Sequence, residues 1–150
     1  MKMLVAVDGS KQSEKAMEEA AKIAGGCSAD QVSLIHVYEK SFNMPMWGEG
    51  YNYTREDIER IKDMEQRTRK EREALVARAV DFFRGKNIEA KGMMEEGHPA
   101  ETIARVVQEE GYDLLVVGSR GLGGLKKLML GSVSNALLQE VPGNVLVVKQ

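Results

Sequence analysis

The chain has 150 residues, of which 43% are hydrophobic and 29% are charged, a balance typical of globular proteins. Its formal net charge of −2 excludes the basic surplus of a general nucleic-acid-binding protein. No apolar run reaches the roughly 20 residues that span a bilayer, which excludes an integral membrane protein of the helical class. The length predicts a single domain over residues 1–150. One cysteine, Cys27, and no signal-like leader predict a cytoplasmic protein without an internal disulfide.

The first part of the chain predicts two strands with a helix between them. Residues 2–8 contain Met3-Leu4-Val5-Ala6-Val7, which is apolar on both faces and typical of a strand inside a parallel sheet. Asp8-Gly9-Ser10 predicts a turn whose serine caps a helix, and this helix ends at Gly25-Gly26. Residues 32–38 predict the second strand.

Residues 42–53 predict a loop, because aromatic residues stand there among Gly, Pro and Asn. From Thr54 or Asp57 to about Phe83 the chain predicts a long helix. Its middle part, residues 65–73, offers no apolar face, which favours a solvated helix that projects past the sheet. A basic docking surface is the alternative interpretation of this charged stretch.

The second half of the chain continues the alternation of strands and helices. A third strand is expected over residues 88–94, although Lys91 and Gly92 weaken its pattern. The remaining elements are a helix from Pro99 to Gly111, a strand over residues 113–117, a helix from Ser132 to Val141 and a strand over residues 145–148.

This alternation of five strands with four helices predicts an α/β fold with a doubly wound sheet of parallel strands and helices on both faces. We expect a Rossmann-like sheet with the strand order 3-2-1-4-5. In such sheets ligands bind beyond the carboxyl ends of the strands, where the strand order reverses. Asp8 ends the first strand and Gly118 ends the fourth, so we expect these two residues to border one crevice.

A glycine-rich stretch follows the fourth strand and carries the strongest functional signal. Gly118, Gly121 and Gly131 precede Ser132, where a helix is expected to begin. Glycines let backbone N–H groups approach a ligand, and a helix N-terminus adds free donors and partial positive charge, so the stretch predicts a phosphate site. A Walker A loop is absent, and Lys126 stands where a dinucleotide fingerprint requires its last glycine.

The intervals of this stretch resemble the nucleotide-binding signature Gly-x2-Gly-x9-Gly-Ser/Thr of the universal stress protein family. Further similar segments cover nearly the whole chain. They are Leu4-Val5-Ala6-Val7-Asp8-Gly9-Ser10, Leu34-Ile35-His36-Val37, Gly97-His98-Pro99-Ala100 and Pro142-Gly143-Asn144-Val145-Leu146-Val147-Val148.

The resemblance implies a site for ATP, with Mg²⁺ or Mn²⁺ held mainly by phosphates and water and with no metal ligands in the protein. It implies that Ala6, Val7 and Asp8 line the adenosine, with Asp8 toward the ribose, and that the backbone of Val37 meets the adenine. It places Val117, Gly118 and Gly121 around the ribose and α-phosphate, and Gly131, Ser132, Val133 and Ser134 around the outer phosphates. Arg120 is either a further phosphate contact or a solvent-facing side chain.

The expected function is that of an ATP-binding universal stress protein, a nucleotide-dependent regulator in the stress response. The resemblance implies a homodimer through the last strand, Val145, Leu146, Val147 and Val148, and an unknown protein partner. No general base is identified, so at most slow ATP hydrolysis is expected. The alternatives are a nucleotide-independent stress protein that acts only through protein partners, and an adenylate-forming or electron-transfer enzyme on the same scaffold.

Three side chains remain outside this assignment. His36 and His98 are interpreted as structural, since one lies in a strand and the other at the start of a helix. Trp47 leads to a hypothesis for the aromatic loop, namely that residues 42–53 fold near the nucleotide and Trp47 reports binding. Packing of the loop elsewhere is the simpler interpretation.

Overall fold

The structure, a computed structural model, describes residues 1–27, 29–39, 53–120 and 130–149. The segments that contain Trp47 and Gly121 lie outside these ranges, and so do the predictions made for them. In the described part of the chain, strands and helices alternate as β1 (Lys2–Ala6), α1 (Lys11–Cys27), β2 (Gln31–Tyr38), α2 (Arg55–Arg84), β3 (Ala90–Glu96), α3 (Pro99–Glu110), β4 (Leu114–Gly118), α4 (Ser132–Glu140) and β5 (Asn144–Val148).

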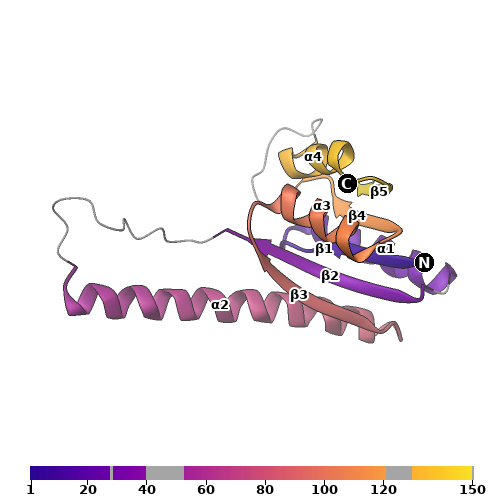
Figure 1. The fold of residues 1–150 in the computed structure, drawn as a ribbon. Helices are drawn as coiled ribbons and strands as arrows, with labels where there is room; N and C mark the ends of the chain where they lie inside the picture. The colour runs from indigo at the N-terminus through magenta and orange to yellow at the C-terminus, as the bar shows by residue number, and fades with distance from the viewer. Residues whose placement is uncertain (28, 40–52, 121–129, 150) are drawn as a thin grey trace.

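The strands form one five-stranded sheet in the order β3-β2-β1-β4-β5, with every pair parallel (Figure 1). β1 lies at the centre, where Val5 is level with Leu34 of β2 on one side and Val116 of β4 on the other. The order reverses between β1 and β4, which run next to each other although they are far apart in sequence. The predicted fold and strand order are confirmed.

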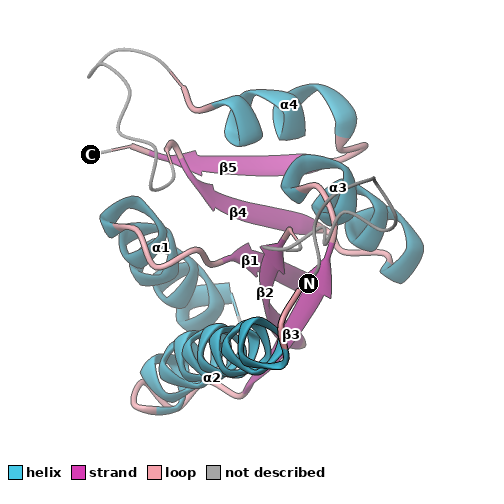
Figure 2. Cartoon of the chain, turned by 90° about the vertical axis from the view of Figure 1, so that its left-hand side faces the viewer, coloured by secondary structure: helices cyan, strands magenta, loops and turns pink. Residues whose placement is uncertain are grey.

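Helices cover both faces of the sheet, α1 and α2 on one side and α3 and α4 on the other (Figure 2). Each face buries its own apolar cluster because alternate strand residues point to opposite faces. On β1, Met3 and Val5 belong to the α1 and α2 side, whereas Leu4 packs toward α3 and α4. This explains why β1 is apolar at successive positions.

Helix α2 is 30 residues long, and its amino-terminal part extends past the sheet (Figure 1). Thr54 caps it in a reciprocal arrangement with Asp57, each side chain bonding the other residue's backbone N–H. Within α2, the buried residues are Val76, Ala79 and Phe83, all in its last third. The predicted solvated projection is therefore confirmed.

Two strand boundaries differ from those predicted. β1 ends at Ala6 rather than Asp8, because the Asp8 side chain already bonds the turn that follows. β3 spans residues 90–96 rather than 88–94, because the Ile88 N–H donates to the Phe83 carbonyl at 3.1 Å and so closes the end of α2. Within the described ranges, no helix combines the length and apolarity required to cross a membrane.

Candidate functional site

The turn after β1 is held by the side chain of Asp8. Its Oδ1 accepts a hydrogen bond from the Ser10 N–H at 2.9 Å. Gly9 between them has a φ of +79°, a left-handed conformation that favours glycine. The Asp8-Gly9-Ser10 turn therefore fixes the orientation of one carboxylate at the carboxyl end of the central strand.

Two buried serines connect this turn to the start of α1. The Ser10 hydroxyl accepts from the Ser13 N–H at 3.1 Å, and the Ser13 hydroxyl accepts from the Asp8 N–H at 3.2 Å. Ser10 was predicted as the helix cap, whereas the role of Ser13 was not foreseen. The sequence could have indicated this role, because Ser13 lies three residues after the cap. A side-chain oxygen at that position can accept a hydrogen bond from the backbone that precedes the helix.

The chain after β4 is held to the start of α4 through Ser119. The Ser119 N–H donates to the Val148 carbonyl of β5 at 2.8 Å, and the Ser119 carbonyl accepts from the Gly131 N–H at 2.8 Å. The Ser134 hydroxyl, which is buried, lies 3.0 Å from the same carbonyl and 3.1 Å from the Gly131 carbonyl. These bonds bring residue 119 together with residues 131–134, which lie more than ten positions further along the chain.

The two loops meet where α1 packs against β4. A Cβ atom placed on Gly118 would lie 2.8 Å from the carbonyl carbon of Gln12, so glycine at this position allows the first turn of α1 to approach the strand. Nearby, the Ser10 hydroxyl lies 3.5 Å from the Arg120 carbonyl. The Asp8 turn and residues 118–120, the described start of the glycine loop, are therefore neighbours. No local sequence pattern predicts the contact between Gln12 and Gly118.

The N-terminus of α4 presents backbone donors at this meeting point. Gly131 is its cap residue with extended backbone, and no side chain of the described residues caps the helix. The first bond of the helix runs from the Asn135 N–H to the Gly131 carbonyl at 3.0 Å, so the N–H groups of Ser132, Val133 and Ser134 have no partner within the helix. Ser132 is exposed. This arrangement suits an anion.

The remaining predicted residues lie around these loops. Ala6, Val37 and Val133 are half-buried and pack toward the α3 and α4 side, and Val117 is buried on that same side. Val7 is buried on the opposite side, and its carbonyl accepts a hydrogen bond from the Nδ1 of His36 at 2.8 Å. Arg120 is half-buried. The contact of His36 with Val7 agrees with a structural role for this histidine.

The profile of the universal stress protein family matches residues 1–149, almost the full length of the chain. The chain belongs to the universal stress protein family. One relative, universal stress protein YxiE of Bacillus subtilis, is 35% identical over 148 residues, which cover 99% of this chain and 98% of the relative. Universal stress protein MJ0577 of Methanocaldococcus jannaschii is 26% identical over 156 residues, with 99% and 94% covered.

Solved structures of universal stress proteins share the fold. The MJ0577 structure superposes with a TM-score of 0.78 at 24% identity, over 99% of this chain and 95% of that one. A universal stress protein of Arabidopsis thaliana with AMP bound gives 0.70 at 23% identity, over 100% and 92%. A universal stress protein in complex with cAMP gives 0.71 at 21% identity, over 99% and 96%.

Proposed function

We propose that this universal stress protein binds ATP at the carboxyl edge of its sheet and acts as a nucleotide-dependent regulator. The observation that carries the proposal is the junction of two loops, where the Asp8 carboxylate and the uncapped N-terminus of α4 border the same place. The motif intervals match a nucleotide-binding signature, and related structures hold AMP and cAMP. A carboxylate suits ribose hydroxyls, and free backbone donors suit phosphate oxygens.

The geometry supports different roles for the two serines of α4. Ser132 is exposed at the first helical position, so both its N–H and its hydroxyl are available to an outer phosphate. The hydroxyl of Ser134 is bonded within the loop, so this residue offers its backbone N–H and holds Gly131 in place. A Cβ atom placed on Gly131 would lie 3.3 Å from the Arg120 Cα, which leaves little room for a side chain beside a phosphate.

The other roles follow the family signature. Ala6, Val7 and the backbone of Val37 are proposed to border the adenosine, and Val117, Gly118 and Gly121 the ribose and α-phosphate. Gly118 also has the structural role of admitting α1. Arg120 is proposed as a further phosphate contact, since it follows the buried Ser119 at the junction of the loops.

A divalent cation fits this site as a companion of the nucleotide. Among the described residues there is no group of three or more His, Cys, Asp or Glu side chains that would hold a metal ion by itself. The proposal places Mg²⁺ or Mn²⁺ on the phosphate oxygens and water, as the family resemblance implies and as is usual for Mg²⁺ with nucleotides. The cation would neutralise phosphate charge, while the chain's own groups orient the nucleotide.

Thermal unfolding with and without Mg-ATP tests this function. ATP at about 100 times its Kd should stabilise the protein by about 2.7 kcal/mol, a shift of several degrees in Tm. Gly131→Val should abolish the shift, and Ser132→Ala should reduce it. Ser134→Ala should lower the Tm of the free protein as well, because a buried hydrogen bond is lost.

The same measurement separates the proposal from its alternative. If wild-type protein shows no shift with ATP, ADP or AMP and retains no adenine nucleotide after purification, the chain works without nucleotide and through protein partners. Slow hydrolysis of the retained ATP would be compatible with a regulator. We further propose that residues 1–150 form one domain and that the protein is a cytoplasmic homodimer through β5.

A further inference from the structure

The strand β3 lies at one edge of the sheet, away from the proposed nucleotide site. Among the described strands it pairs with β2 alone, and its residues Lys91 and Gly92 are exposed. Unpaired N–H and C=O groups along an edge can accept another strand. This edge lies at the opposite end of the sheet from β5, so an interface here is separate from a dimer through the last strand.

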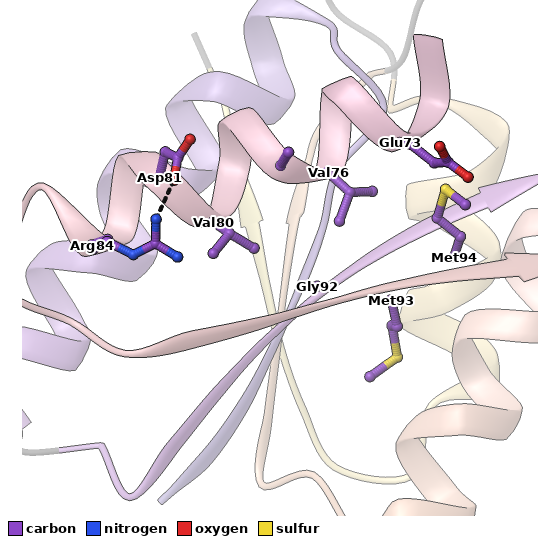
Figure 3. A pocket seen from close by; sticks show the side chains of 9 residues that line it. Glu73, Val76, Val80, Asp81, Arg84, Gly92, Met93 and Met94 are labelled. Carbon is purple, nitrogen blue, oxygen red and sulfur yellow. Dashed lines mark hydrogen bonds and ion pairs between the residues drawn. The ribbon is translucent and has the colours of Figure 1, made fainter. Parts of the chain in front are cut away.

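A groove of about 500 Å³ lies between β3 and α2 along this edge (Figure 3). Met94 points toward α2, whereas Met93 points away from it (Figure 3). Gly92 has no side chain, and a Cβ there would lie only 2.3 Å from the Cγ1 of Val76. Val76 of α2 therefore packs directly over Gly92, and a methionine follows two residues further along on the same face of the strand.

The order of residues along β3 is self-complementary in one antiparallel register. If Met93 faces Met93 of a second copy, Lys91 faces Glu95, and Gly92 faces Met94. If Gly92 instead faced Gly92 of the second copy, Glu89 would lie opposite Glu95, which has the same charge. If Met94 faced Met94, Lys91 would have no acidic residue opposite it. Opposite charges across a strand pair stabilise it and like charges destabilise it, so the charges favour the first register.

The charges around the groove are compatible with a second copy. Asp81 pairs with Arg84 at 2.6 Å, and Glu73 pairs with Arg69 at 2.9 Å, so the rim of α2 carries little unbalanced charge. Glu95 has a long contact of 3.4 Å with Arg105, whose shorter contact of 2.8 Å is with Glu109. Within the described ranges Lys91 has no ion-pair partner, and Glu95 of a second copy would provide one.

We propose that β3 pairs with β3 of a second copy of this chain, antiparallel and with Met93 on the two-fold axis. Each copy then places Met94 opposite Gly92 of the other, beside the groove, and forms a Lys91–Glu95 pair on the opposite face of the sheet. The contact is small and weak, so it forms at high protein concentration. It extends the sheet across two chains and does not depend on nucleotide.

Disulfide trapping tests the register. In a Cys27→Ser background, Met93→Cys should form a covalent dimer under mild oxidation, because directly opposed Cβ atoms lie within reach of a disulfide. Lys91→Cys is the matched control: it is more exposed, but in this register it faces residue 95 rather than its own copy. Equal or faster trapping of the Lys91→Cys protein would overturn the proposal, since chance collisions would explain both.

Charge exchange provides an independent measurement that keeps the native methionines. The weight-average mass of the wild-type protein should rise between about 10 µM and about 1 mM, where small interfaces dissociate. Lys91→Glu and Glu95→Lys should each lose this rise, and an equimolar mixture should regain it, because both cross-strand pairs are then opposite in charge. Lys62→Glu, on the projecting part of α2, should behave as wild type.

A dimer through β5 raises the starting mass in all these proteins alike, so its presence or absence does not change the comparison. If the rise is absent in the wild type, or if the mixture fails to regain it while both variants keep wild-type circular dichroism, the β3 pairing is wrong. Binding of ATP, measured in the same samples, should be equal in all variants.

Discussion

At the scale of the residue, Gly118 has a packing role in addition to its proposed role in binding. Its place in the glycine motif predicts close approach of a ligand, but the structure also shows the backbone of Gln12 against it. The neighbouring atoms at 2.8 and 2.9 Å belong to the backbone and Cβ of a helix, which cannot rotate away as a long side chain can. Packing therefore requires glycine at this position, and the proposed nucleotide site would add a second constraint.

Gly118→Ala should destabilise the protein by about 1–3 kcal/mol, because the added methyl group overpacks a rigid contact. Gly25→Ala is the matched control, since nothing lies within 4 Å of a Cβ at that position. Within a helix, that change should be neutral or stabilising by up to about 1 kcal/mol. Urea denaturation measures both values. Equal stabilities for the two variants would show that α1 can move away from β4.

At the scale of the element, α2 combines a packed end with a solvated end. Its last third carries Val76, Ala79 and Phe83 against the sheet, whereas the first half depends on its cap and on side-chain pairs such as Arg67–Asp63. Exposed pairs of this kind contribute only a few tenths of a kcal/mol each. The amino-terminal cap is therefore the strongest local stabilisation of this end.

Thr54→Ala should lower amide hydrogen-exchange protection in the first turns of α2 about fivefold, as expected for loss of about 1 kcal/mol of cap stability. The global Tm should stay nearly unchanged, because this end is remote from the core, and Thr54→Ser should retain protection. A large drop in Tm for Thr54→Ala would instead show that the projecting half supports the core.

The effect should also depend on pH. Hydrogen bonds from the Thr54 side chain and backbone hold the pKa of Asp57 below its ordinary value of 3.8. A group whose folded pKa is depressed contributes stability above its unfolded pKa and loses it as the pH falls through the folded pKa. The difference in protection between wild type and Thr54→Ala should therefore be full at neutral pH and shrink below about pH 4.

The sequence predicted the alternation and the projecting helix, because both follow from apolar periodicity. The strand order was predicted from the Rossmann-like fold class that the alternation indicates. It located the strand ends less well. Ile88 looks like a strand residue but closes α2, and only the backbone bond to Phe83 reveals this. The burial of the Ser134 hydroxyl and the approach of Gln12 to Gly118 depend on tertiary packing, which no local pattern encodes.

At the scale of the whole molecule, the two edges of the sheet differ. β5 is apolar over Val145 to Val148, with side chains packed on both faces, so an unprotected β5 would favour association. β3 carries Lys91, Glu95 and Glu96 and supports only a weaker contact. The difference predicts a stable dimer through β5 and a concentration-dependent second step through β3.

Light scattering at a few micromolar should give twice the chain mass of 16.6 kDa, because the β5 contact is expected to persist where the β3 contact has dissociated. The Lys91→Glu variant should give the same mass at this concentration. If the wild-type protein is a monomer at this concentration, the proposed β5 interface is wrong. The proposal for β3 would still be tested by the trapping and charge-exchange experiments.

The position of β1 has a consequence for how the protein is made. The central strand is synthesised first, yet its neighbour β4 follows late, and the bond from the Lys2 N–H to Asp113 spans 111 positions in sequence. The nascent chain can pair β1 with β2 early, but the Asp8 turn can meet the start of α4 only after β4 and α4 have been synthesised. The two halves of the proposed nucleotide site therefore come together late in folding, and nucleotide binding at that site would mark completed molecules.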